Sequence, residues 1–227
     1  MKKIIFAFLI LFSTNIISSQ SLISKFYCQI LGNKDASLEN KEMVYRALKK
    51  LGIKNVEDVS VKQMNGVGPA FARLPLSSFT AFGIWLDEDY LSKCSPIERV
   101  FHIYHEAAHY AKKHHQKILA GAAIMLPAIA IALIKLNQLV ADPIYKYGAM
   151  SGVSLSALLG NYFYVLPKIN KTHEKEADLL AAKILISSGN EKIVDYYIEE
   201  LKKYNPNSEN IWWYSIGQQI KYLQELK

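Results

Sequence analysis

The sequence is poor in cysteine and lacks several motifs that would point to a function. Its 227 residues include two cysteines, Cys28 and Cys94, which are too few for a disulfide scaffold or a thiolate metal cluster. We find no internal repeat, no arginine-rich stripe and no glycine-rich phosphate-binding loop. The net charge of +7 therefore gives no reason to expect a nucleic-acid partner, and it fits solubility or attraction to anionic lipid.

Apolar residues, by contrast, are plentiful. They make up 51% of the chain and charged residues 21%, a balance that excludes wholesale disorder. The length suits one domain, or one domain that follows an export segment.

The N-terminus has the pattern of a secretory signal peptide. Met1-Lys2-Lys3 is a short positive region, the apolar run 4–12 follows it, and small and polar residues then take over. We therefore predict a signal peptide over 1–19 and an exported protein of the cell envelope, with an uncleaved anchor as the alternative. In that oxidising compartment, pairing of Cys28 with Cys94 and separate buried thiols both stay open.

The remaining chain predicts a mainly helical α+β fold. Segment 20–60 contains an amphipathic helix over 38–51 that ends at Gly52, and segment 61–116 contains a small antiparallel sheet followed by a capped helix. Strands are expected at Phe71-Ala72 and over 79–86. The capping box, formed by Ser95 with Glu98 and supported by Pro96 at the first helical position, predicts that the capped helix begins here and runs to about His115.

Segment 117–167 predicts a hydrophobic helical hairpin. Two uncharged stretches, 118–134 and 147–167, are long enough to be membrane spans or fully buried core helices, and the small size of the chain favours the membrane. Lysines at the base of the hairpin would suggest the cytoplasmic side, but the signal peptide favours the outer side. Segment 168–227 then predicts a helix over 171–187 that stops at Gly189, and further C-terminal helices.

The capped helix carries His105-Glu106-Ala107-Ala108-His109. Histidines at i and i+4 lie on one helical face, where both imidazoles can bind one metal ion. Glu106 is rotated away from this face, so its carboxylate is expected beside the metal, where it can take a proton from water as the catalytic base. A coincidental pattern on a polar helix is the alternative interpretation.

A third ligand is needed for a stable zinc site. Glu174 is the candidate, at the start of the helix after the hairpin, and Asp178 lies one turn further on the same face. If Glu174 binds the metal, Asp178 can accept the remaining ring N–H of a ligating histidine.

Other titratable residues near these motifs are expected to have lesser roles. We expect a polar contact for His102, solvated positions for His173 and Glu176, and positions at the helix end or at a membrane surface for His114 and His115. The sequence does not single out substrate-binding residues.

These motifs resemble a known family. His105-Glu106-x-x-His109, then His114, a hydrophobic hairpin and Glu174-x-x-Ala177-Asp178 are similar to the membrane-associated gluzincins of the HtpX and CAAX prenyl protease type, metallopeptidase family forty-eight. The resemblance implies one zinc ion per chain held by His105, His109 and Glu174, with Glu106 as general base and residues 61–227 as one metallopeptidase domain. It also implies that a strand between about Ala70 and Leu86 holds the peptide in extended form.

The chain departs from this family near its end. Where relatives carry a His-Pro box followed by an arginine, this chain has Asn205-Pro206 and Asn210, so the residue that stabilises the oxyanion is open, with Tyr196, Tyr197 or Tyr214 as candidates.

We therefore expect a zinc metalloendopeptidase of the cell envelope, with a peptide or protein substrate, membrane lipid as a further partner and the active site outside the cytoplasm. The alternatives are a non-catalytic, zinc-stabilised binding or chaperone-like module, favoured by the two asparagines, and a plain membrane-anchored structural protein.

Overall fold

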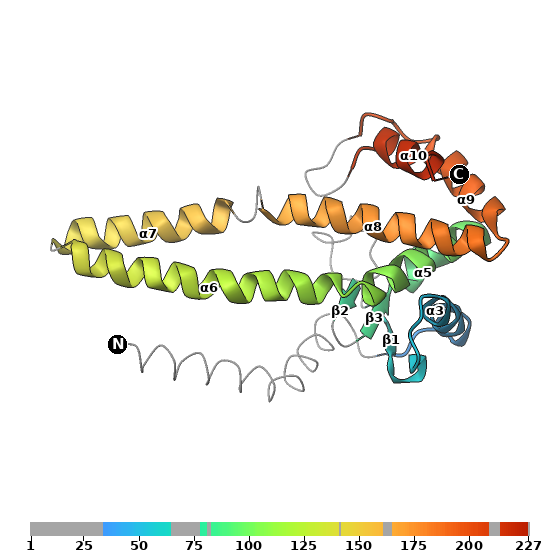
Figure 1. The fold of residues 1–227 in the computed structure, drawn as a ribbon, viewed down its shortest axis with the longest axis horizontal. Helices are drawn as coiled ribbons and strands as arrows, with labels where there is room; N and C mark the ends of the chain where they lie inside the picture. The colour runs from blue at the N-terminus through green and yellow to red at the C-terminus, as the bar shows by residue number, and fades with distance from the viewer. Residues whose placement is uncertain are drawn as a thin grey trace.

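A computed structural model describes residues 34–64, 78–80, 83–140, 142–160, 165–208 and 214–226. The signal peptide predicted over 1–19, Cys28 and the strand predicted at Phe71-Ala72 lie outside these residues. The described chain forms a helical body from which a long helical hairpin projects (Figure 1). This architecture agrees with the mainly helical α+β class expected from the sequence.

The body begins with α3 (Leu38–Lys50), which confirms the predicted amphipathic helix. Its apolar face is fully buried at Val44, Ala47 and Leu48. The helix stops because Gly52 adopts φ +85°, and the N–H of Ile53 then donates to the carbonyl of Leu48 over 3.0 Å. This is the glycine-dependent ending that the sequence predicts.

The small sheet differs from the expected one. Its strands are β1 (Ser60–Gln63), β2 (Ser78–Thr80) and β3 (Gly83–Leu86), in the order β1-β3-β2. The segment 79–86, predicted as a single strand, instead contributes to two strands, β2 and β3, which pair antiparallel with each other, and β1 runs parallel to β3. The prediction of a wholly antiparallel sheet is therefore wrong, because alternation within a strand carries no information about the direction of a neighbour that is distant in sequence.

Residue 83 must be a glycine for this parallel pairing. A Cβ atom there would lie 2.4 Å from the carbonyl oxygen of Ser60 in β1. The absence of a side chain lets the two strands approach, and β3 is then buried along its whole length.

The capped helix is present as α5 (Pro96–Ala111), which follows the short η1 (Val56–Asp58) and α4 (Glu88–Lys93). Both hydrogen bonds of the capping box between Ser95 and Glu98 are formed. The helix ends earlier than the predicted His115, because Lys113 adopts the left-handed conformation with φ +56°. A new helix begins at His114.

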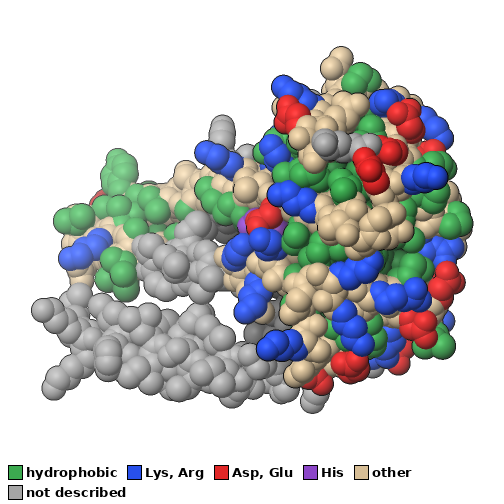
Figure 2. Space-filling view, turned by 45° about the vertical axis from the view of Figure 1, so that its right-hand side comes forward, with side chains coloured by type: hydrophobic (Ala, Val, Ile, Leu, Met, Phe, Trp, Pro, Cys, Tyr) green, Lys and Arg blue, Asp and Glu red, His purple; other side chains and the backbone are tan. Residues whose placement is uncertain are grey.

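The hairpin consists of α6 (His114–Leu139) and α7 (Pro143–Gly160), which pack against each other. A helical pair was predicted here, although it begins a few residues before the expected position 117. Figure 2 shows hydrophobic side chains over the projecting hairpin and charged side chains of both signs over the body. Among the described residues, none of the helices combines the length and the apolar character that crossing a membrane demands.

The chain returns to the body through α8 (Leu166–Ser187), which packs along α5. Buried alanines on both helices, which include Ala107, Ala108, Ala177 and Ala181, let the two backbones approach closely. The predicted stop at Gly189 is confirmed: the residue has φ +74°, and the N–H of Asn190 donates to the carbonyl of Leu185 over 2.9 Å.

Two further helices, α9 (Glu191–Leu201) and α10 (Ile216–Gln224), complete the body. The core lies between α3, the sheet, α5, α8 and these two helices. Its largest fully buried side chains include Trp85, Phe101 and Leu48. This core fixes α5 and α8 side by side, which determines where their polar faces meet.

Candidate metal centre

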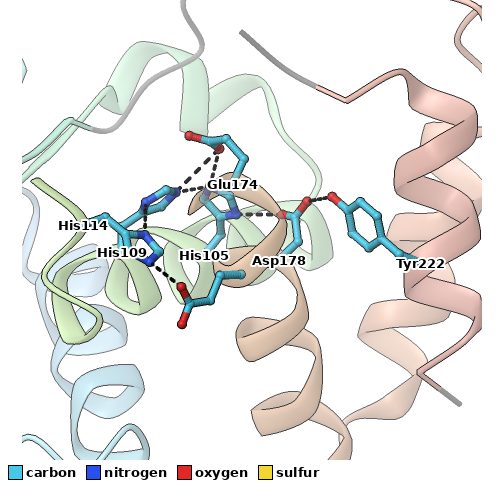
Figure 3. A network of polar contacts seen from close by, with 7 residues as sticks. His105, His109, His114, Glu174, Asp178 and Tyr222 are labelled. Atoms are coloured by element: carbon cyan, nitrogen blue, oxygen red, sulfur yellow. Dashed lines mark hydrogen bonds and ion pairs between the residues drawn. The ribbon is translucent and has the colours of Figure 1, made fainter. Parts of the chain in front are cut away.

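Three side chains meet where α5 and α8 pack together. The Nε2 atoms of His105 and His109 are 3.0 Å apart, and Oε2 of Glu174 lies 3.2 Å from the first and 3.5 Å from the second. Figure 3 shows the carboxylate of Glu174 facing both imidazoles. The structure thus brings together the three residues that the sequence proposes as metal ligands.

The spacing of these atoms fits a zinc ion. Tetrahedral zinc binds histidine nitrogen and carboxylate oxygen at about 2.0–2.1 Å, which puts neighbouring ligand atoms about 3.3 Å apart. The three separations of 3.0, 3.2 and 3.5 Å lie around that value. Two imidazoles and one carboxylate are also a donor set that zinc prefers and that leaves a fourth position open.

The site is sheltered but not closed. The side chains of His105 and Glu174 keep 14% and 13% of their surface exposed, whereas that of His109 keeps 2%. His105 and Glu174 therefore keep some contact with solvent. Burial alone would raise the pKa of Glu174, but the two neighbouring imidazoles hold it at about 2, so Glu174 carries a negative charge at neutral pH.

Glu106 is buried beside this cluster. Its Oε2 atom has no hydrogen-bond partner among the described residues, and burial raises the pKa of its carboxyl group to about 8. An orphaned buried oxygen is rare in folded proteins and indicates a site that a further group completes. A carboxyl group with this pKa is suited to proton transfer near neutral pH.

Asp178 makes the contact that the sequence proposes for it. Its Oδ1 lies 2.7 Å from Nδ1 of His105, so the ring N–H donates to the carboxylate and the Nε2 lone pair of His105 faces the other ligand atoms. Burial alone would lower the pKa of His105, but the carboxylates of Asp178 and Glu174 raise it well above its usual value. The aspartate therefore makes this imidazole a better electron donor.

The sequence does not indicate that Tyr222 belongs to the site. This tyrosine of α10 is buried, and its hydroxyl donates to Oδ2 of Asp178. The capping box at Ser215 and Gln218 indicates where α10 starts, but no pattern indicates which side of it meets α8. Of the three tyrosines considered for the site, Tyr197 instead stacks on Phe101, with ring centroids 3.8 Å apart.

Three of the lesser expectations are wrong. His114 is fully buried at the start of α6 rather than at the C-terminal end of the capped helix or at a membrane surface, and His173 is buried rather than solvated. Glu176 is half-buried and pairs with Lys112 and His114. The early end of α5 accounts for the position of His114, whose ring contacts His109 of α5 and both His173 and Glu176 of α8.

Two further expectations have mixed outcomes. His102 makes the polar contact predicted for it, with Nε2 3.1 Å from the hydroxyl of Tyr90. Asn205 accepts a hydrogen bond from the N–H of Asn207 in an exposed turn, and Asn210 lies outside the described residues, as does the side chain of His115. Cys94 forms no disulfide with any described residue, and its pairing with Cys28 is untested because Cys28 is not described.

Comparisons of the chain with protein-family models, with curated proteins and with solved structures each gave no match. The function is therefore argued from the geometry and chemistry of this cluster.

Proposed function

We propose that the chain is a zinc-dependent metalloendopeptidase that hydrolyses peptide bonds of proteins at the cell envelope, with residues 61–227 as a gluzincin-like domain. One observation carries the proposal: Nε2 of His105, Nε2 of His109 and Oε2 of Glu174 lie within 4.8 Å of one another. Glu106, whose side chain is buried, directly follows His105 in the chain.

A zinc ion held by these three residues would supply a Lewis acid that polarises a peptide carbonyl and makes water more acidic. Glu106 is the general base: its unpartnered Oε2 accepts a proton from the attacking water and passes it to the leaving amine. Burial raises the pKa of Glu106 to about 8, and a zinc ion beside its carboxyl group would lower that pKa, which would keep Glu106 ionised and able to accept the proton.

The position of β2 supports a substrate in extended form. Among the described strands, β2 forms an edge of the sheet, and it packs against α5 and α6. An edge strand binds an extended peptide through backbone hydrogen bonds, with little dependence on side chains. This feature suits an endopeptidase of broad specificity. No feature of the described residues favours prenylated peptides as the substrate.

Glu106→Gln tests the role of the base. We expect the purified variant to keep one zinc per chain and to lose cleavage of casein or a labelled peptide by at least about 100-fold. Glu57→Gln, which changes a carboxylate on the surface of the body, is the matched control and should cleave normally. Normal cleavage by Glu106→Gln would refute the assignment of the base.

The non-catalytic alternative is tested in the same assay. A wild-type chain that binds zinc stoichiometrically but never cleaves peptide, with or without chelator, would favour a zinc-stabilised binding module. The observation that favours this alternative is Asn205, which stands where members of the family that the chain resembles carry a histidine.

Envelope and membrane association are part of the proposal. Large apolar side chains at the end of the hairpin are exposed, among them Leu139 (80%), Ile144 (82%) and Tyr145 (74%), and such a surface suits contact with lipid. We expect the chain without residues 1–19 in the membrane fraction of cells. Recovery of the full-length, uncleaved chain in the cytosol would contradict export, and recovery of the cleaved chain outside the membrane fraction would contradict contact of the hairpin with lipid.

A further inference from the structure

A second chain of polar contacts leads away from the cluster on the side of His109. Nδ1 of His109 lies 2.9 Å from Nδ1 of His114, and Nε2 of His114 lies 3.1 Å from Oε2 of Glu176. The other oxygen of Glu176 lies 3.0 Å from the ammonium group of Lys112. Figure 3 shows the rings of His109 and His114 turned toward each other beside the ligands.

The positions of the protons follow from the partners. A carboxylate paired with an ammonium group can only accept hydrogen bonds. Nε2 of His114 therefore carries a proton, and this N–H donates a hydrogen bond to Glu176. A neutral imidazole has one N–H, so Nδ1 of His114 is then an acceptor. Nδ1 of His109 must therefore donate to it, which leaves the lone pair of His109 on Nε2, the atom that faces His105 and Glu174.

We propose that His114, itself oriented by Glu176, is a positioning residue for His109, which it fixes in the tautomer and ring orientation required of a metal ligand. This inference rests on the proposed metal site and extends it. Asp178 performs the same task for His105 through its contact of 2.7 Å. Each of the two imidazole ligands is then held by its own carboxylate, directly in one case and through a second histidine in the other.

The surroundings of His114 support this role. Its side chain is completely buried, and its ring stacks on that of His173 with centroids 4.1 Å apart and planes 2° from parallel. Burial of an imidazole costs free energy unless its nitrogens are hydrogen-bonded. The left-handed conformation of Lys113 is what turns His114 toward His109, since one more turn of α5 would place the two side chains about 140° apart around the helix axis.

Substitution of His114 separates positioning from packing. His114→Phe removes both nitrogens but keeps a flat ring to stack on His173, and His114→Asn keeps an oxygen near the position of Nδ1 to accept from His109. His102→Phe is the matched control, because it makes the same change at another histidine of the helical body, on α5, whose side chain makes one polar contact, to Tyr90. Affinity for zinc is measured by competition with a chromophoric chelator, and thermal unfolding of the zinc-free proteins monitors the fold.

We expect His114→Phe to bind zinc about 10–100-fold more weakly than the wild type. His114→Asn should recover most of that loss, and His102→Phe should bind as the wild type does. An unchanged affinity in His114→Phe, or an equal loss in all three variants, would overturn the inference. A wild-type chain that binds no zinc would instead refute the metal site itself.

Nitrogen-15 NMR of histidine in the zinc-free protein gives a second readout, with His109→Gln for assignment. The wild type should carry the proton of His109 on Nδ1, and His114→Phe should populate both tautomers. A proton on Nε2 of His109 in the wild type would overturn the inference. If His114→Phe fails to fold, Glu176→Met, a change at a half-buried position, should weaken zinc binding several-fold, and an unchanged affinity there would also overturn it.

Discussion

Most residues of the cluster and its surroundings can be predicted from the sequence, and two of them cannot. His105, Glu106 and His109 are predicted from their spacing alone, because a helix places i and i+4 on one face whatever surrounds it. Glu174 and Asp178 are also predicted, since they repeat that spacing on a second helix. His114 and Tyr222 are not predictable, because their contacts depend on a left-handed residue and on the docking of α10, which no periodicity encodes.

Asp178→Asn tests the hydrogen-bonded side of His105. The amide can donate where the carboxylate only accepts, so the proton on Nδ1 of His105 is no longer fixed. We expect zinc affinity to fall about 10–100-fold. Tyr222→Phe, which removes the hydroxyl that donates to Asp178, should produce a smaller loss in the same direction. Wild-type affinity in Asp178→Asn would show that the contact has no influence on the metal.

At the scale of elements, helix ends were the most predictable features and strand pairing the least. The capping box at Ser95 and the glycine endings at Gly52 and Gly189 use contacts within a few residues, so sequence fixes them locally. The parallel pairing of β1 with β3 joins segments that are distant in sequence. The end of α5 was placed too late because Lys113 has the conformation usually taken by glycine.

Lys113→Gly tests that ending of α5. A non-glycine residue with φ +56° is strained by about 1 kcal/mol relative to glycine. We therefore expect Lys113→Gly to raise the free energy of unfolding by up to about 1 kcal/mol with zinc affinity unchanged. Lys113→Val should lower it by about 1–2 kcal/mol, because a β-branched residue tolerates this conformation worst. Chemical denaturation measures both, and equal stability of the two variants would contradict the strain.

At the scale of the whole molecule, the site depends on the hairpin that returns the chain to the body. The proposed ligands lie on α5 and α8, with α6 and α7 between them in the sequence. The sequence predicts this return, because a hairpin of two apolar helices of similar length ends close to where it begins. It does not predict how closely α5 and α8 approach, which follows from buried alanines on both helices.

Removal of zinc should therefore destabilise the whole fold. A ligand that binds only the folded state stabilises it in proportion to the logarithm of its concentration, by about 2.7 kcal/mol at 100 times the dissociation constant. We expect a chelator to lower the unfolding temperature of the wild type by several degrees and to leave that of Glu174→Ala unchanged. A chelator effect of equal size on both proteins would show that the ion acts elsewhere.

The most direct test of the account is the zinc content of the purified full chain after reconstitution and removal of loosely bound ions. Elemental analysis should give one zinc per chain for the wild type, none for Glu174→Ala, and one for Glu200→Ala, which removes a carboxylate that pairs with Lys203 outside the cluster. A zinc-free wild type, or full occupancy in Glu174→Ala, would contradict the claim that residues of α5 and α8 jointly bind the metal.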